Sequence, residues 1–197
     1  MLTRLYLIRH GESAGNAGLP TANHKTIPLT QKGRLQADML AKKWQVEPDY
    51  IFVSPFWRAK ETAQPTLERF PDAIRQVTSD LQEFTYLSPA TCVNTTKEER
   101  RPRVDAYWER CEPYYIDGEG AESFAQLVER AQRFLQGMVK FSGISNHMVF
   151  AFSHMLFMIC FRSLVEKPDL TLEERMRQFR KYPAIKNAAY LSFDIWW

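Results

Sequence analysis

Short apolar runs with β-forming residues alternate with segments of helical periodicity along this 197-residue chain. Strands are predicted at residues 5–8, 50–53, 73–77, 147–152 and 188–195. The first run is apolar on both faces, which is typical of a central strand in a parallel sheet. Between the runs, apolar residues recur at helical spacing, most clearly over residues 124–138. This alternation predicts an α/β fold, a three-layer sandwich in which helices cover both faces of a mostly parallel central sheet.

Capping residues locate several helix starts. Thr30 precedes an amphipathic segment, and Thr96 and Thr171 each begin the Thr-x-x-Glu pattern of a capping box. Another helix is predicted to begin near Trp57. We expect Pro65 to kink or end that helix, because proline lacks the N–H that an interior helical position donates.

Residues 84–120 interrupt the alternation with an irregular stretch of aromatic residues, prolines and arginines. Long excursions of this kind inside a compact domain are usually functional or cover a site. No Gly/Ser-rich linker divides the chain, and its length suits a single core. We therefore expect one domain over residues 1–197, with residues 84–120 as a cap over the carboxyl ends of the strands.

Composition argues against several classes of protein. The net charge is only +3, from 26 basic and 23 acidic residues, whereas nucleic-acid-binding proteins normally carry a larger, clustered excess. The three cysteines are widely spaced without a Cys-x-x-Cys pair, so neither a disulfide framework nor a zinc site is predicted. The apolar stretch 148–161 is shorter than the roughly 20 residues that span a bilayer. We expect a cytoplasmic monomer or homodimer without nucleic-acid or membrane partners.

Three of the predicted strands end in histidine or lead to arginine. The first runs into Arg9 and His10, the second leads to Arg58, and the fourth ends at His154. In open α/β sheets, ligands bind just beyond the carboxyl ends of the strands. One histidine or arginine in such a place is often structural. Two of each, brought from three strand ends, predict one shared site for an anion.

Two imidazoles and two guanidiniums without a carboxylate or cysteine cluster suit a phosphoryl group. Phosphoryl transfer places negative charge on three equatorial oxygens, and its catalysis depends on positioning and cationic stabilisation. The planar fork of arginine binds two such oxygens at once. A neutral histidine can attack phosphorus itself and form a phosphohistidine. We therefore expect phosphoryl chemistry that needs neither a metal ion nor a cofactor.

Four motifs occur in order along the chain. They are LIRHGESAGN at residues 7–16, Pro28-Leu29-Thr30-x-x-Gly33-x-x-Gln36-Ala37, Ser54-x-x-x-Arg58-Ala59-x-x-Thr62-Ala63, and Phe152-Ser153-His154. Together they resemble the histidine phosphatase superfamily, the phosphoglycerate-mutase-like fold. Glu83 falls where that family places its acid, and residues 120–130 resemble the start of its long helix. The resemblance covers residues 5 to about 160.

The resemblance implies a role for each matched residue. His10 would be the nucleophile that becomes phosphorylated. Glu83 would protonate the leaving oxygen and later deprotonate the attacking water. The remaining matched residues would bind the phosphoryl group: Arg9, Arg58, His154 and, through its side-chain amide, Asn16.

The chain resembles the phosphatases of the family more than the mutases. The Glu-Arg-His-Tyr-Gly segment of the mutases is missing, and Phe84-Thr85-Tyr86 follows Glu83 instead. The aromatic residues of the excursion favour an apolar leaving group over a small sugar acid: Tyr86, Tyr107, Trp108, Tyr114 and Tyr115. We expect hydrolysis of a small-molecule phosphomonoester. The alternatives are a phosphoglycerate-mutase-type phosphotransferase and a non-catalytic module that binds a phospho-ligand or a protein.

Two further features bear on the predicted site. Arg100, Arg101 and Arg103 form a basic cluster, which is either a solvated helix face or a grip for a second anion. Met155 stands where the family usually has glycine after its second histidine. Glycine would leave more room for the backbone to approach a phosphate.

Overall fold

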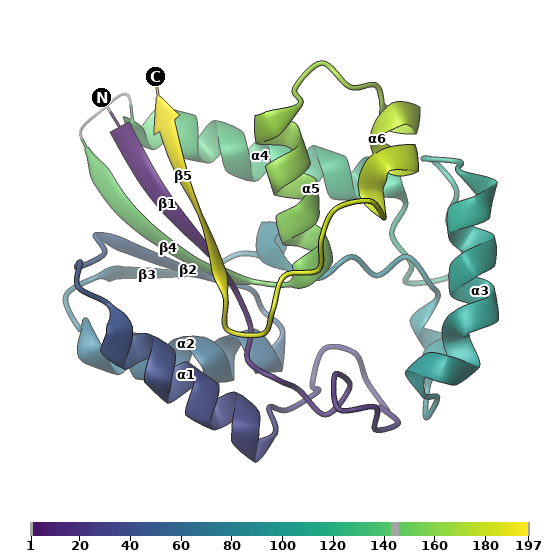
Figure 1. Cartoon of the computed structure of the whole chain (residues 1–197), viewed down its shortest axis with the longest axis horizontal. Helices are drawn as coiled ribbons and strands as arrows, with labels where there is room; N and C mark the ends of the chain where they lie inside the picture. The colour runs from purple at the N-terminus through teal and green to yellow at the C-terminus, as the bar shows by residue number, and fades with distance from the viewer. Residues whose placement is uncertain (1, 143–145, 197) are drawn as a thin grey trace.

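The structure, a computed structural model, describes residues 2–142 and 146–196. Its centre is a five-stranded sheet in the order β3-β2-β4-β1-β5 (Figure 1). The strands are β1 (Leu2–Arg9), β2 (Tyr50–Val53), β3 (Ile74–Val77), β4 (His147–Ser153) and β5 (Tyr190–Trp196). All neighbouring pairs are parallel except β1 and β5, which are antiparallel. The mostly parallel sheet predicted from the sequence is therefore confirmed.

Helices cover both faces of this sheet, as predicted (Figure 1). They are α1 (Gln31–Lys43), α2 (Trp57–Arg69), α3 (Lys97–Arg110), α4 (Phe124–Ser142), α5 (Met155–Glu166) and α6 (Leu172–Phe179), with 3₁₀ turns η1 (Ser79–Leu81) and η2 (Pro89–Cys92). The pair α1 and α2 packs on one face, and α4 and α5 pack on the other, with α6 beside them. Among the helices of residues 2–142 and 146–196, none combines the length and the apolar character of a transmembrane segment.

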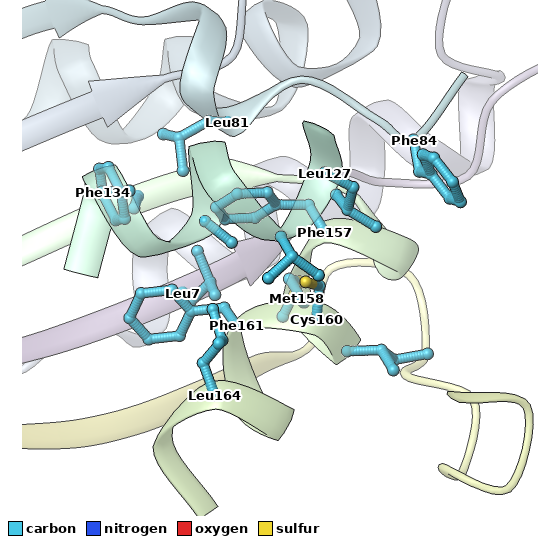
Figure 2. Packing of buried hydrophobic residues seen from close by; sticks show 14 of the residues in the cluster. Leu7, Leu81, Phe84, Leu127, Phe134, Phe157, Met158, Cys160, Phe161 and Leu164 are labelled. Atoms are coloured by element: carbon cyan, nitrogen blue, oxygen red, sulfur yellow. The ribbon is translucent and has the colours of Figure 1, made fainter. Parts of the chain in front are cut away.

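Side chains of the central strands alternate between two cores, as the period of a strand requires. Leu5 and Leu7 of β1 join the core under α4 and α5, whereas Ile8 joins the core under α1 and α2. Phe150 and Phe152 of β4 lie in the same core as Ile8. Figure 2 shows the first core, where side chains from α4 and α5 gather around Leu7. Both faces of the sheet are thereby buried, and its strand ends are held in fixed places.

The helix that begins at Trp57 continues through Pro65 to Arg69, so of the two effects predicted for this proline, a kink or an end, the end is wrong. Ala59 and Ala63 form part of its inner face and are fully buried. Packing of that face against α1 and the sheet outweighs the single hydrogen bond that a proline forfeits.

The three predicted helix caps are confirmed. Thr96 and Glu99 form a complete capping box at the start of α3, and Thr171 and Glu174 form another at the start of α6. At the start of α1, the Thr30 side chain accepts the N–H of Gly33.

Residues 84–120 are more regular than the sequence predicts, because α3 occupies much of them. Tyr107 of α3 is only 3% exposed, and its ring packs on those of Tyr86 and Trp108. Trp108 stacks on Phe179 of α6, with 5.2 Å between ring centroids. These rings fix the segment to the body of the protein, so Tyr107 belongs to the core and not to an open wall.

Two members of the basic cluster have partners within the same segment. Arg103 pairs with Asp117, and Arg100 donates to the carbonyl oxygen of Thr95. Arg101 is exposed on the outside of α3. Arg100 and Arg103 therefore stabilise the loops on either side of α3.

Candidate active site

The carboxyl ends of β1, β4 and β2 lie side by side in the sheet. The last pair of the β1–β4 ladder is Arg9 with Ser153, so His10 and His154 follow at the same level. The centroids of these two imidazole rings are 5.1 Å apart. Ser54 follows β2 and contacts His154. The structure thus brings both predicted histidines to one place, as expected for neighbouring parallel strands.

His10 is held in one tautomer by its two neighbours. Its Nδ1 lies 2.6 Å from the carbonyl oxygen of Gly11, which can only accept, so Nδ1 carries the proton. Its Nε2 lies 3.2 Å from Nε of Arg58, which can only donate, so Nε2 carries the lone pair. Burial, together with the charges of Arg58 and Arg9, holds the pKa of His10 well below its usual range. His10 is therefore a neutral imidazole with its lone pair on Nε2.

His154 is fully buried, and burial with the nearby charge of Arg58 holds its pKa well below the usual range. Its Nε2 lies 2.8 Å from Oγ of Ser54, which accepts the N–H of Phe56. Among the described residues, Nε2 is the only acceptor for the Ser54 hydroxyl proton. The proton of the neutral His154 ring consequently belongs on Nδ1.

Two buried N–H groups of this cluster, His154 Nδ1 and Arg9 Nε, have no hydrogen-bond partner among the described residues. An unpaired buried donor costs about 1–3 kcal/mol, and a bound water, an ion or a catalytic role can account for such a group in a folded protein. The Arg9 guanidinium is anchored by a second nitrogen, Nη1, which donates to the carbonyl oxygen of Ile185. An anion with several oxygens would satisfy both unpaired donors.

Arg58 comes from the first turn of α2 and is only 6% exposed. Besides donating to His10, it donates through Nη1 to the carbonyl oxygen of His24 at 2.7 Å. Burial lowers the pKa of Arg58 to about 10, partly offset by the carboxylate of Glu83. Arg58 remains cationic at neutral pH and is held beside the His10 ring.

Gly11 and Gly33 allow the loop after β1 to touch the start of α1. A Cβ on Gly33 would lie 2.0 Å from the carbonyl oxygen of Glu12, and one on Gly11 would lie 2.5 Å from that of Gly33. Gln36 accepts the N–H of Glu12, and Thr62 of α2 accepts the N–H of Gly11. Residues of the first three sequence motifs therefore hold this loop against both helices.

Glu83 follows η1, and its carboxylate binds the start of α5. Its Oε1 accepts the N–H groups of Phe84, Leu156 and Phe157 at 2.9, 3.1 and 3.4 Å. The first N–H groups of a helix lack internal partners, and His154 at the N-cap supplies none from its side chain. Burial raises the pKa of Glu83, although the Phe84 amide and nearby arginines oppose this. A raised pKa makes this carboxyl group a better proton donor near neutral pH.

Asn16 is exposed, and its side-chain oxygen accepts from Nδ2 of Asn187 at 3.0 Å and from Oγ of Ser13 at 3.1 Å. The same Asn187 amide donates to the carbonyl oxygen of His10 at 3.1 Å. Only Nδ2 of Asn16 is left to donate to a ligand. Sequence reasoning missed Asn187, because one polar residue before the last strand belongs to no motif or periodic pattern.

Two surface hollows have linings that contain neither of the two predicted histidines nor Arg9, Arg58 or Glu83. One of about 450 Å³ lies at the opposite, amino end of the sheet, near Asp49 and His147. Another of about 400 Å³ lies between η1 and α4. Across residues 2–142 and 146–196, no three His, Cys, Asp or Glu side chains gather as a metal site would require. The cluster at the strand ends is therefore the candidate site on chemical grounds.

Sequence comparison identifies relatives over most of the chain. Residues 5–188 match the sequence model of the histidine phosphatase superfamily (branch 1). A phosphoglycerate mutase-like protein of Arabidopsis thaliana is 30% identical in an alignment of 188 positions that covers 85% of this chain and only 64% of that protein. The adenosylcobalamin/alpha-ribazole phosphatase of Salmonella typhi is 27% identical in an alignment of 168 positions that covers 82% of this chain and 79% of that protein.

Solved structures share the fold. A mycobacterial glucosyl-3-phosphoglycerate phosphatase matches with a TM-score of 0.75 at 20% identity, over 98% of this chain and 91% of that one. A putative alpha-ribazole-5'-P phosphatase from Escherichia coli matches with a TM-score of 0.74 at 23% identity, over 98% and 90%. The fold and the family resemblance predicted from the sequence are thus confirmed. This chain belongs to branch 1 of the histidine phosphatase superfamily.

Proposed function

We propose that this chain is a metal-independent phosphatase that hydrolyses a small-molecule phosphomonoester through a phosphohistidine on His10. The observation that carries this proposal is a neutral His10 of fixed tautomer beside two unpaired buried donors, Arg9 Nε and His154 Nδ1. A nucleophile and several N–H donors in one buried place are what phosphoryl transfer through a histidine requires. Relatives named as phosphatases support the same class of reaction.

In the first step, Nε2 of His10 attacks phosphorus, and the bond from phosphorus to the ester oxygen breaks. The Nε–H of Arg58, which donates to Nε2 of His10, donates to a phosphoryl oxygen instead, and this frees the lone pair of Nε2 for attack. Arg9 and His154 donate to the same oxygens with their unpaired N–H groups. Glu83 gives its proton to the leaving oxygen, which departs as an alcohol, and Glu83 is left as a carboxylate.

In the second step, water attacks the phosphohistidine. The carboxylate of Glu83 takes a proton from that water, the bond between phosphorus and Nε2 breaks, and the lone pair returns to His10. Nδ2 of Asn16 donates a hydrogen bond to the phosphoryl group in both steps. The cycle consumes one water, releases one alcohol and one phosphate, and restores the acid form of Glu83.

The proposed reaction needs no metal ion, because side chains supply the positive charge that Mg²⁺ provides in other phosphoryl-transfer sites. Arg9 and Arg58 are both cationic and mostly buried. Low effective dielectric strengthens the attraction of such charges for an anion.

The leaving group is proposed to be apolar or aromatic. The ring of Tyr86 packs on Phe84, next in the chain to Glu83, with 5.2 Å between ring centroids. Burial, with a smaller contribution from the carboxylate of Glu83, raises the pKa of Tyr86 to about 12, so its hydroxyl stays neutral. We expect aryl phosphates to be hydrolysed faster than 3-phosphoglycerate. Efficient phosphoryl exchange between phosphoglycerates would favour the mutase alternative instead.

The decisive experiment is to trap the phosphoenzyme with a radiolabelled phosphomonoester and to map the label. We expect an acid-labile phosphoryl group on His10, lost in His10→Ala together with turnover. The control is His147→Ala, at the amino end of β4, which should keep both label and activity. Thermal unfolding checks that each variant is folded. Turnover in folded His10→Ala near the wild-type rate would refute the proposal.

A further inference from the structure

Glu122 and Arg130 form a buried ion pair beside the site. Nε and Nη2 of Arg130 contact the two carboxylate oxygens of Glu122 at 2.5 and 2.9 Å, and Arg130 is only 3% exposed. Pairing through two nitrogens fixes the plane of the guanidinium. The remaining nitrogen, Nη1, donates to the carbonyl oxygens of Asp80 and Gln82 at 2.7 and 2.8 Å.

These contacts hold the backbone on both sides of Glu83. Arg130 binds the carbonyl groups that precede Glu83, including that of Gln82 directly before it. Glu122 donates its own N–H to the carbonyl oxygen of Thr85, two residues after Glu83, at 2.8 Å. The short segment that carries the proposed proton donor is therefore held at one end by the Arg130 guanidinium and at the other by the backbone N–H of Glu122, the ion-pair partner of Arg130.

The pair also contacts the helix start that binds the Glu83 carboxylate. The guanidinium of Arg130 lies 5.3 Å from the ring centroid of Phe157, whose N–H donates to Oε1 of Glu83. Oε1 accepts three backbone N–H groups, whereas Oε2 has only a longer contact of 3.5 Å with the N–H of Leu156, so the proton of the acid form belongs on Oε2. Arg130 thus contacts both the backbone that precedes Glu83 and the first turn of α5, which binds the Glu83 carboxylate.

We propose that Glu122 and Arg130 are positioning residues for proton transfer: they set where Oε2 of Glu83 lies relative to the leaving oxygen without touching the substrate. This inference rests on the proposed phosphatase reaction and deepens it. A proton is transferred over a hydrogen bond of about 2.6–3.2 Å, so a small shift of Glu83 matters. The donors that bind phosphate come from β1, α2 and the end of β4, and within the described part of the chain Arg130 makes no hydrogen bond to any of these elements. One hydrogen bond, from the Ser153 hydroxyl to the carbonyl oxygen of Leu81, links the end of β4 to the segment that Arg130 holds.

The consequence is a selective defect. A leaving oxygen of low basicity, such as that of p-nitrophenyl phosphate, departs without a proton. An alkyl leaving group needs the proton. Weakening the pair should therefore slow phosphorylation of His10 by alkyl phosphates far more than phosphorylation by p-nitrophenyl phosphate. A general loosening of the fold would slow both substrates by similar factors.

The test variant is Arg130→Lys, which keeps the charge but loses the two-nitrogen pairing. The matched control is Arg175→Lys. Arg175 is another buried arginine that donates to a side chain, Ser163, and to backbone carbonyl groups, but between α5 and α6. Single-turnover rates of phosphoenzyme formation are measured with an alkyl phosphate and with p-nitrophenyl phosphate. We expect the alkyl rate of Arg130→Lys to fall about 10- to 100-fold more than its p-nitrophenyl rate. Arg175→Lys should show no such difference.

A second variant tests the same proposal in case Arg130→Lys does not fold. Replacing the pair with apolar residues, Glu122→Leu with Arg130→Met, avoids a lone buried charge and often leaves stability near that of the parent. It still removes the donor from the carbonyl groups of Asp80 and Gln82. We expect the same selective loss in this variant.

Combining Arg130→Lys with Glu83→Gln distinguishes a failure of the positioning role from a failure of the proposed acid role of Glu83. If the pair acts through Glu83, Arg130→Lys should add no further selectivity in the Glu83→Gln background. Equal losses for both substrates in Arg130→Lys, while Glu83→Gln is selective, would overturn the positioning role alone. If Glu83→Gln slows the alkyl phosphate and p-nitrophenyl phosphate equally, the acid role of Glu83 is refuted, and the positioning role is refuted with it.

Discussion

Replacing Glu83 with glutamine isolates proton transfer from phosphate binding. The amide oxygen of Gln can still accept the three N–H groups that now bind Oε1, so the side chain should keep its place at the start of α5. What the variant loses is the acidic proton on Oε2. We expect the fold to be preserved and phosphorylation of His10 by alkyl phosphates to slow sharply.

The expected size follows from general acid catalysis, which contributes about 10²- to 10⁴-fold where the leaving group is basic. That range corresponds to about 2.7–5.4 kcal/mol of activation free energy. With p-nitrophenyl phosphate the loss should stay below about tenfold, because the phenolate leaves unaided. Arg58→Ala should slow both substrates by similar factors, since Arg58 acts on phosphoryl charge that both share.

The pH dependence gives an independent check. Burial raises the pKa of Glu83 against the opposing charges of Arg58, Arg9 and Arg130, with the neutral ring of His154 beside them. The acid form is the donor, so the wild-type rate with alkyl phosphates should fall as pH rises through that raised pKa. In Glu83→Gln this fall should be absent.

The assay is rapid quench of phosphoenzyme formation in a single turnover, because Glu83 also acts on water in the second step. Thermal unfolding of each variant serves as the control for folding. Equal losses for the two leaving groups in Glu83→Gln would refute the acid role of Glu83. Glu122 would then be a poor alternative candidate for the proton donor, since both of its carboxylate oxygens bind Arg130. Glu119 would be the next carboxylate to test.

Three further results are expected. Gly33→Ala places a Cβ 2.0 Å from the Glu12 carbonyl oxygen and should lower the free energy of unfolding, measured by urea denaturation, by about 1–3 kcal/mol. The control Gly137→Ala, whose Cβ would have no atom within 4 Å, should raise it by about 0.5–1 kcal/mol. Similar changes in the two variants would contradict the close approach at Gly33. Because burial lowers the pKa of His10, the unfolded chain binds an extra proton below about pH 6.5. Acidification through that pH should therefore destabilise wild type relative to His10→Asn, by up to about 1.4 kcal/mol per pH unit, and parallel stability curves would count against this. Saturating chelator should leave activity unchanged, and a loss restored by Mg²⁺ would refute metal independence.

The sequence determined the elements that depend on neighbouring residues. The strand positions, the two capping boxes and the start of α2 follow from period and from side chains three residues apart, and the structure confirms them. The grouping of His10 with His154 could be predicted because parallel strands end at one edge of a sheet. The roles of these residues came from the family resemblance and remain predictions.

Only the tertiary structure decided what depends on residues far apart in the chain. Asn187 reaches the carbonyl oxygen of His10 from 177 positions away, and Glu83 binds the start of α5 from 73 and 74 positions away. Likewise, packing carries α2 through Pro65 and buries Tyr107, which local preferences could not reveal. The physical reason is that burial and the pairing of buried polar groups are set by which elements meet in space, whereas local sequence determines only the conformation of each element.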